Sequence, residues 1–94
     1  MFYLTHHAAE RAKQRFGMDR DEAEAVLSRA VLTESRDIGR DKPKGRARFV
    51  MDVETGAVFV VERNGARSWT ATTTLYPLRK VGPGQQVRDW GPWV

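Results

Sequence analysis

Three strand-like segments separated by turn signals fill residues 46–76, and they restrict the chain to folds that contain an antiparallel sheet. The pair Asn64-Gly65 is the strongest short hairpin signal, because both residue types accept the positive φ angles of a two-residue turn. A Glu-Thr-Gly tripeptide ending at Gly56 marks an earlier turn. The third segment is also rich in β-branched and aromatic residues. The expected strands are Arg46–Val53, Ala57–Asn64 and Ser68–Pro77.

Two helices are predicted ahead of this sheet. Thr5 can cap the first helix, because its hydroxyl can accept from a free amide of the first turn, and Gly17 can end it. Asp19 begins the second helix, and Glu22 three residues later completes a capping-box pattern. The apolar stripes expected to face the core are Ala8, Ala12 and Phe16 in the first helix and Ala23, Val26, Leu27 and Ala30 in the second.

The chain has 94 residues, which suffice for one domain with a small core. We predict an α+β domain at residues 1–80, with two N-terminal helices packed on one face of a three- to four-stranded antiparallel sheet. Val31–Glu34 can add a strand, and Phe2–Leu4 is either a short edge strand or a lead-in. Glu34–Arg48 is expected to be an exposed, mobile loop, because it contains proline and glycine. Residues 81–94 are expected to form an irregular tail packed on the domain.

Side chains alternate between the two faces of a strand, so the third strand divides into two sets. The set expected in the core consists of Trp69, Ala71, Thr73 and Leu75. The opposite set is a row of hydroxyls that ends in a phenol: Ser68, Thr70, Thr72, Thr74 and Tyr76. Arg46 and Arg48 of the first strand are expected on this second face, which would suit a phosphate-bearing ligand. The alternative is that threonines occupy an exposed strand because they are good strand formers.

The charge balance favours a nucleic-acid partner. The chain carries 16 Lys+Arg against 12 Asp+Glu, a net charge of +4, and most of the cations are arginine. Arginine binds phosphate as a planar fork and stacks on bases, although a codon-biased genome would produce the same excess. No apolar run is long enough to span a membrane, and the N-terminus does not have the pattern of a signal peptide, so a cytoplasmic location is expected. Without cysteine, neither a disulfide framework nor a thiolate zinc site can form.

The two histidines, His6 and His7, lie in the first turn of the predicted first helix. The positive end of the helix dipole disfavours the imidazolium there, so a neutral imidazole can accept a proton. Arg11 and Arg15 follow His7 at four-residue spacing. A base beside phosphate-binding guanidiniums is what metal-free RNA cleavage requires. A metal site is disfavoured, because adjacent histidines diverge by about 100° on a helix and no third ligand stands out.

The stretch THHAAERAKQR fits the pattern S/T-x-H-x-x-x-R-x-x-x-R, and the third strand ends in TLYP. With this order of elements, the chain resembles small bacterial and phage proteins of the barnase–EndoU–colicin–RelE (BECR) ribonuclease fold, including the RegB-type phage endoribonucleases. The resemblance implies that His7 is the catalytic histidine and that Arg11 or Arg15 binds phosphate. RegB-type enzymes use a second, later histidine, and no histidine follows His7 in this chain. Tyr76 or Arg48 would therefore have to act as the acid.

The sequence thus predicts a metal-independent endoribonuclease that needs no cofactor and whose partner is RNA. His7 is the expected base, and Arg11 and Tyr76 complete the expected catalytic set. The alternative is a non-catalytic phage or mobile-element module of the same fold that binds nucleic acid, a host protein or an antitoxin. The residues expected to bind nucleic acid are Arg15, Lys42, Lys44, Arg46, Arg48, Thr72 and Thr74.

Overall fold

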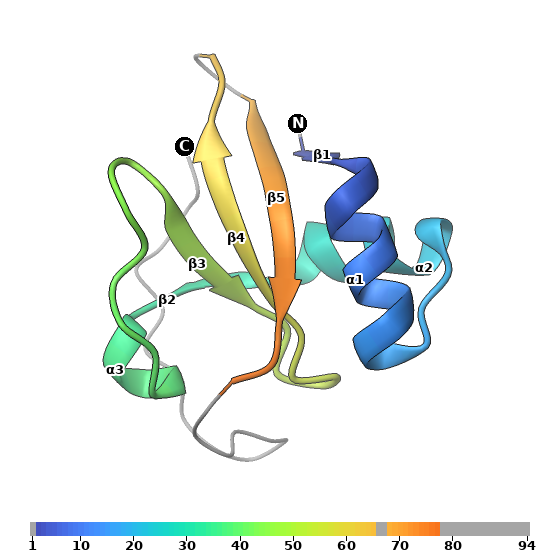
Figure 1. The fold of residues 1–94 in the computed structure, drawn as a ribbon, viewed down its shortest axis with the longest axis horizontal. Helices are drawn as coiled ribbons and strands as arrows, with labels where there is room; N and C mark the ends of the chain where they lie inside the picture. The colour runs from blue at the N-terminus through green and yellow to red at the C-terminus, as the bar shows by residue number, and fades with distance from the viewer. Residues whose placement is uncertain (1, 66–67, 78–94) are drawn as a thin grey trace.

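The computed structural model describes residues 2–65 and 68–77, which form an α+β unit of helices on a single sheet (Figure 1). The fold class predicted from the sequence is confirmed. The predicted tail, residues 81–94, lies outside the described residues. In chain order the elements are β1 (Phe2–Leu4), α1 (His6–Phe16), α2 (Arg20–Arg29), β2 (Val31–Thr33), α3 (Ser35–Ile38), β3 (Arg48–Met51), β4 (Val58–Arg63) and β5 (Trp69–Leu75).

The strands lie in the order β1-β5-β4-β3-β2. The pairs β2–β3, β3–β4 and β4–β5 are antiparallel, as predicted. The sheet nevertheless has one strand more than expected and is mixed, because Phe2–Leu4 pairs parallel with Trp69–Ala71. All the other elements lie in the chain between β1 and β5, and a parallel pair requires a long connection of this kind. A three-residue strand is too short to carry an alternation pattern, so the sequence left this segment ambiguous.

The predicted helix ends are confirmed. The hydroxyl of Thr5 accepts a hydrogen bond from the amide of Ala8 at 3.1 Å, and Gly17 ends α1 with φ = 69°. The carboxylate of Asp19 accepts from the amide of Glu22 at 2.8 Å at the start of α2. These caps determine where α1 begins and ends and where α2 begins.

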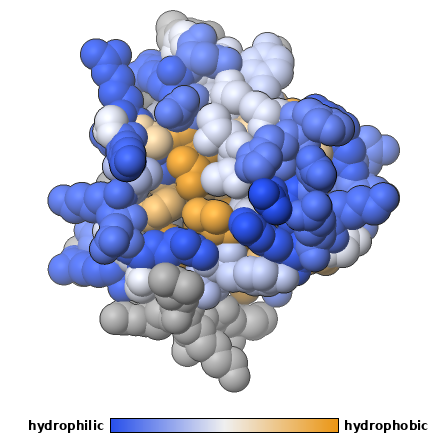
Figure 2. Space-filling model, in the orientation of Figure 1, coloured by the Kyte–Doolittle hydropathy of each residue, from blue (hydrophilic) through white to orange (hydrophobic). Residues whose placement is uncertain are grey.

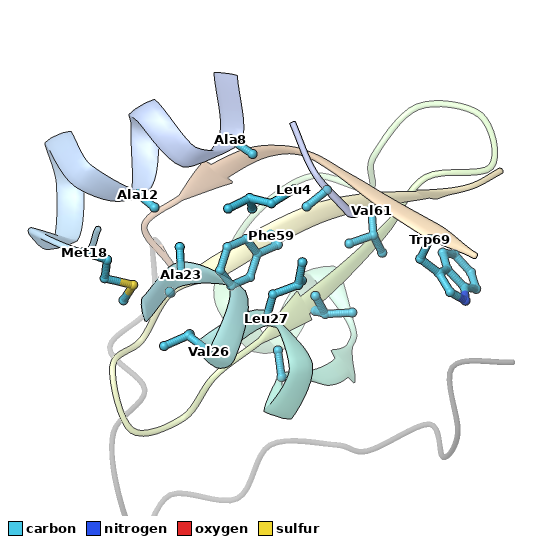
Figure 3. Packing of buried hydrophobic residues seen from close by; sticks show 14 of the residues in the cluster. Leu4, Ala8, Ala12, Met18, Ala23, Val26, Leu27, Phe59, Val61 and Trp69 are labelled. Atoms are coloured by element: carbon cyan, nitrogen blue, oxygen red, sulfur yellow. The ribbon is translucent and has the colours of Figure 1, made fainter. Parts of the chain in front are cut away.

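The main core lies between α1, α2 and one face of the sheet (Figure 3). Both predicted apolar stripes are buried there, except that Phe16 is only half-buried at the margin. Phe59 of β4 and Leu27 of α2 are among the largest fully buried side chains. Ala8 and Ala12 present only methyl groups, which allows α1 to pack closely along β5.

A β-bulge in β5 overturns the predicted division of its two faces. Val60 pairs with Thr73 but Val61 pairs with Ala71, so Thr72 is an extra residue without a partner in β4. Up to Ala71 the predicted core face is correct. Beyond the bulge the faces exchange: Thr74 is fully buried beneath α1, whereas Thr73 and Leu75 lie on the opposite face.

That opposite face carries a second, smaller core, because Ile38 of α3 packs against Phe49, Met51 and Val58. The helix α3 was not predicted, since the segment from Glu34 to Arg48 was expected to be a loop throughout. Away from α3 this face is less covered, and the side chains of Val60, Thr73 and Leu75 are half-buried there. We call the region of these three residues the open face.

Asp52, directly after β3, joins α2 to the turn before β4. Its carboxylate is 3% exposed and accepts two hydrogen bonds from the guanidinium of Arg29, both at 3.0 Å. It also accepts from the amide and the hydroxyl of Thr55, at 3.1 and 2.7 Å. Burial alone would raise the pKa of Asp52, but the hydrogen bonds from Arg29 and Thr55 outweigh it and hold the pKa below its ordinary value.

Candidate nucleic-acid interface

The helix α1 is fastened to the edge of β5 by hydrogen bonds. β1 pairs with β5 only as far as Ala71, which leaves the later carbonyl groups on that edge without a strand partner. The hydroxyl of Thr5 donates to the carbonyl of Thr72 at 3.4 Å, and Arg15 Nη1 donates to the carbonyl of Thr74. In return the buried hydroxyl of Thr74 donates to the carbonyl of Ala8 at 2.9 Å. These bonds set the rotation of α1 about its axis.

With α1 held this way, His7 and Arg11 lie on the flank of the helix away from α2. Ala9, on the other flank, packs against the main core, and His7 is about 160° from it around the helix. His7 is exposed, and its imidazole has no hydrogen-bond partner among residues 2–65 and 68–77. Arg11, one turn further on, is half-buried, and its guanidinium donates to Gln14 Oε1 at 2.9 Å. His7 and Arg11 are therefore one helical turn apart on this flank, with the guanidinium of Arg11 directed toward Gln14.

Tyr76 is not near His7. Its hydroxyl donates to the carbonyl of Arg15, and its ring lies 4.8 Å from that of Phe16 at an interplanar angle of 46°. Arg15 is eight residues from His7 along α1, a rise of about 12 Å. The structure thus does not bring together the expected catalytic set, because Tyr76 lies at the opposite end of the helix from His7.

Several residues expected to bind nucleic acid are used by the fold instead. Thr74 is fully buried, so its hydroxyl cannot reach a ligand, and this prediction is wrong. Thr72, the bulge residue, is half-buried and donates its hydroxyl to the carbonyl of Val60 at 3.3 Å. Arg15 is half-buried, and its guanidinium donates a hydrogen bond to the carbonyl of Thr74 in β5. Sequence alternation could not foresee these roles, because it assumed an unbroken strand.

The basic loop between α3 and β3 keeps its predicted exposure. Lys42, Lys44 and Arg46 of the loop are exposed, and so is Arg48, the first residue of β3. Arg48 pairs with Val61 of the main core, so it lies on the face of the sheet that carries α1 and α2, and the prediction that it lies on the opposite face is wrong. Arg40, which the sequence reasoning did not single out, donates from Nε to the carbonyl of Tyr76 at 2.6 Å. This bond joins the loop to the end of β5, and the only sequence signal for it was the arginine content of the segment.

Figure 2 shows apolar surface in the middle of this side of the molecule, between two hydrophilic lobes. In the same orientation as Figure 1, one lobe lies over α3 and the loop to β3, and the other lies over α1 and α2. The open face, to which Val60 and Leu75 contribute half-buried side chains, belongs to β4 and β5, which lie between α1 and the strand that follows the basic loop. The loop between α3 and β3 carries the exposed cations Lys42, Lys44 and Arg46, and α1 carries Arg11 and, on another side of the helix, Lys13. Cations on both sides of an apolar surface can hold a phosphate backbone while leaving room for bases.

A pocket of about 590 Å³ opens beneath the basic loop, beside α3. Of the residues expected to bind nucleic acid, Lys42 and Arg48 line it, whereas Lys44 and Arg46 are not part of the lining. Arg36 also lines it and forms an ion pair with Glu34. No sequence pattern indicated this pocket, because the segment that forms α3 was expected to be a loop.

Within residues 2–65 and 68–77, no group of three or more His, Asp or Glu side chains is arranged to hold a metal ion. No helix in this same part of the chain is long and apolar enough to cross a membrane.

The chain matches no protein-family model, and comparison with curated proteins and with solved structures likewise gives no significant match. The resemblance to BECR-fold ribonucleases therefore rests on the stretch from Thr5 to Arg15 and on the order of elements.

Proposed function

We propose that the protein is a metal-independent endoribonuclease that holds RNA across the open face, with His7 as the general base. One observation carries the proposal: the exposed imidazole of His7 stands one helical turn from Arg11, on the flank of α1 away from α2. The helix is fastened to β5 at both ends, so this pair is held in a defined position. An RNA substrate makes the cytoplasm the expected compartment.

In the proposed reaction His7 removes the proton from a ribose 2′-hydroxyl. The 2′-oxygen attacks the adjacent phosphorus, and the bond from phosphorus to the 5′-oxygen breaks. Arg11 stabilises the negative charge that develops on the phosphoryl oxygens. Tyr76 lies at the other end of α1, and Arg48 lies in β3, two strands from β5. We therefore assign the proton that the leaving 5′-oxygen takes up to solvent. The products are a 2′,3′-cyclic phosphate and a 5′-hydroxyl.

The test is cleavage of a single-stranded RNA in the presence of EDTA, with detection of 2′,3′-cyclic phosphate ends. His7→Ala should lower the rate by roughly 10²–10⁴-fold, which is the usual contribution of a general base. His6→Ala is the matched control, because His6 is equally exposed but points about 100° away around the helix. Equal loss in both variants, or cleavage by His7→Ala at the wild-type rate, would refute the assignment of the base.

A second candidate, a nucleic-acid-binding module without catalysis, is favoured by one specific observation. The hydroxyl of Tyr76 is bonded to Arg15, so the predicted acid is engaged far from His7. If the wild-type protein binds RNA but forms no cyclic phosphate end on any substrate, this second function replaces the first.

A further inference from the structure

The pocket beneath the basic loop is separate from the flank of α1 that carries His7. Its lining comes from β2, α3, the loop and β3. In the sheet, β3 is two strands from β5, a spacing of roughly 10 Å, and α1 lies on the far edge of β5. A group bound in this pocket therefore cannot be the group that His7 contacts.

The charge of the pocket suits an anion. Arg36, Lys42 and Arg48 bring three cationic groups to its wall. Glu34 is the one carboxylate in the described lining, and it is paired with Arg36. Neither Lys42 nor Arg48 forms an ion pair within residues 2–65 and 68–77. Arg48 is further oriented by a hydrogen bond from Nη1 to the carbonyl of Ala47, at 3.0 Å.

The remaining lining of the pocket suits a nucleobase as well. Pro43, Ala47 and Phe49 supply apolar wall, and Ser35 supplies a hydroxyl group, whereas the hydroxyl of Thr33 donates to the carbonyl of Val31 at 2.9 Å. A volume of about 590 Å³ falls within the range of small-molecule sites. A nucleotide combines the two requirements, since its phosphate ester needs cations and its base needs an apolar surface with a few polar groups.

We infer that this pocket is a subsite for one phosphate-bearing nucleotide of the RNA strand, remote from the phosphodiester bond that is cleaved beside His7. The inference rests on the proposed function for the identity of the strand as RNA. The open face lies between the pocket and α1, so a single strand can cross it from one to the other (Figure 2). Binding in the pocket would set affinity and sequence preference, not the rate of the chemical step.

The loop itself provides matched controls. Lys42 and Arg48 line the pocket, whereas Lys44 and Arg46 are equally exposed cations of the same loop that do not. Titration of the full chain with adenosine and uridine 5′-monophosphates, followed by NMR chemical shifts, measures the subsite directly. Lys42→Ala and Arg48→Ala should each weaken binding of the preferred monophosphate by about ten-fold, but Lys44→Ala and Arg46→Ala by less than about two-fold. The corresponding nucleosides should bind at least about ten-fold more weakly than the monophosphates.

A non-cleavable 2′-O-methyl oligonucleotide distinguishes a strand from a free nucleotide. It should displace the monophosphate, and the pocket variants should raise KM for RNA while kcat stays unchanged. Failure of the oligonucleotide to compete, or equal losses in the pocket variants and the loop controls, would overturn the subsite. Monophosphate binding is read without any cleavage, so this result is independent of whether His7 proves to be a base.

Discussion

The carboxylate of Asp52 is buried and accepts hydrogen bonds from both Arg29 and Thr55. Its pKa is lower in the folded chain than in the unfolded chain. The stabilisation is therefore complete above the unfolded value, about 3.9, and is lost as the pH falls through the folded value. Asp52→Asn should reduce the free energy of unfolding by about 2 kcal/mol at pH 7. Below pH 4 the difference between the two proteins should shrink. Urea denaturation from pH 7 to pH 2.5 measures both effects.

Glu54→Gln is the control for this prediction. Glu54 also pairs with Arg29, at 3.3 Å, but its side chain is 70% exposed, so its loss should cost less than about 1 kcal/mol. A deficit in Asp52→Asn that stays constant at all pH values would mean that the carboxylate contributes through packing alone.

At the scale of the elements, the attachment of α1 to β5 decides where His7 and Arg11 lie. Thr74→Val keeps the shape of the side chain but removes the hydroxyl that donates to Ala8, so it should destabilise the fold by about 1 kcal/mol. Thr73→Val is the matched control, because Thr73 is the neighbouring threonine on the open face. Thermal and urea unfolding of the two variants provide the measurement. If both behave alike, the hydroxyl of Thr74 does not hold the helix.

Thr73 and Thr74 also show which feature of the fold could not be predicted from the sequence, namely the face of the sheet that each side chain occupies. Helix caps such as Thr5 and Asp19 depend only on a residue three positions away. They could therefore be predicted from the sequence alone. A bulge depends on how two strands meet, and threonine fits either face, so nothing in the sequence indicated that Thr74 would turn inward. The separation of His7 from Tyr76 has a similar cause, because it depends on how far β5 runs along α1.

At the scale of the whole molecule, cations on both sides of the open face should make RNA binding strongly dependent on salt. Log affinity should fall linearly with log salt, and each phosphate contact removed should reduce the slope by roughly 0.7 for a single strand. Arg11→Ala should show this reduction. Lys13→Ala removes an exposed cation from another side of the same helix and should leave the slope unchanged. Fluorescence anisotropy of a labelled oligonucleotide between low and high salt measures it, and a flat dependence in the wild type would contradict phosphate-dominated binding.

The parallel pairing of β1 with β5 also bears on how the chain is made. Phe2 lies opposite Trp69, so β1 cannot join the sheet until β5 has been synthesised. A ribosome releases α1 early, yet the carbonyl groups of Thr72 and Thr74 that hold this helix emerge only at the end of the sheet. Bringing α1 and β5 together closes a long loop of chain, and this closure costs conformational entropy before the contacts form. Folding is therefore slowed. A nascent or truncated chain that lacks β5 therefore lacks both carbonyl groups to which α1, the helix that carries His7, is fastened.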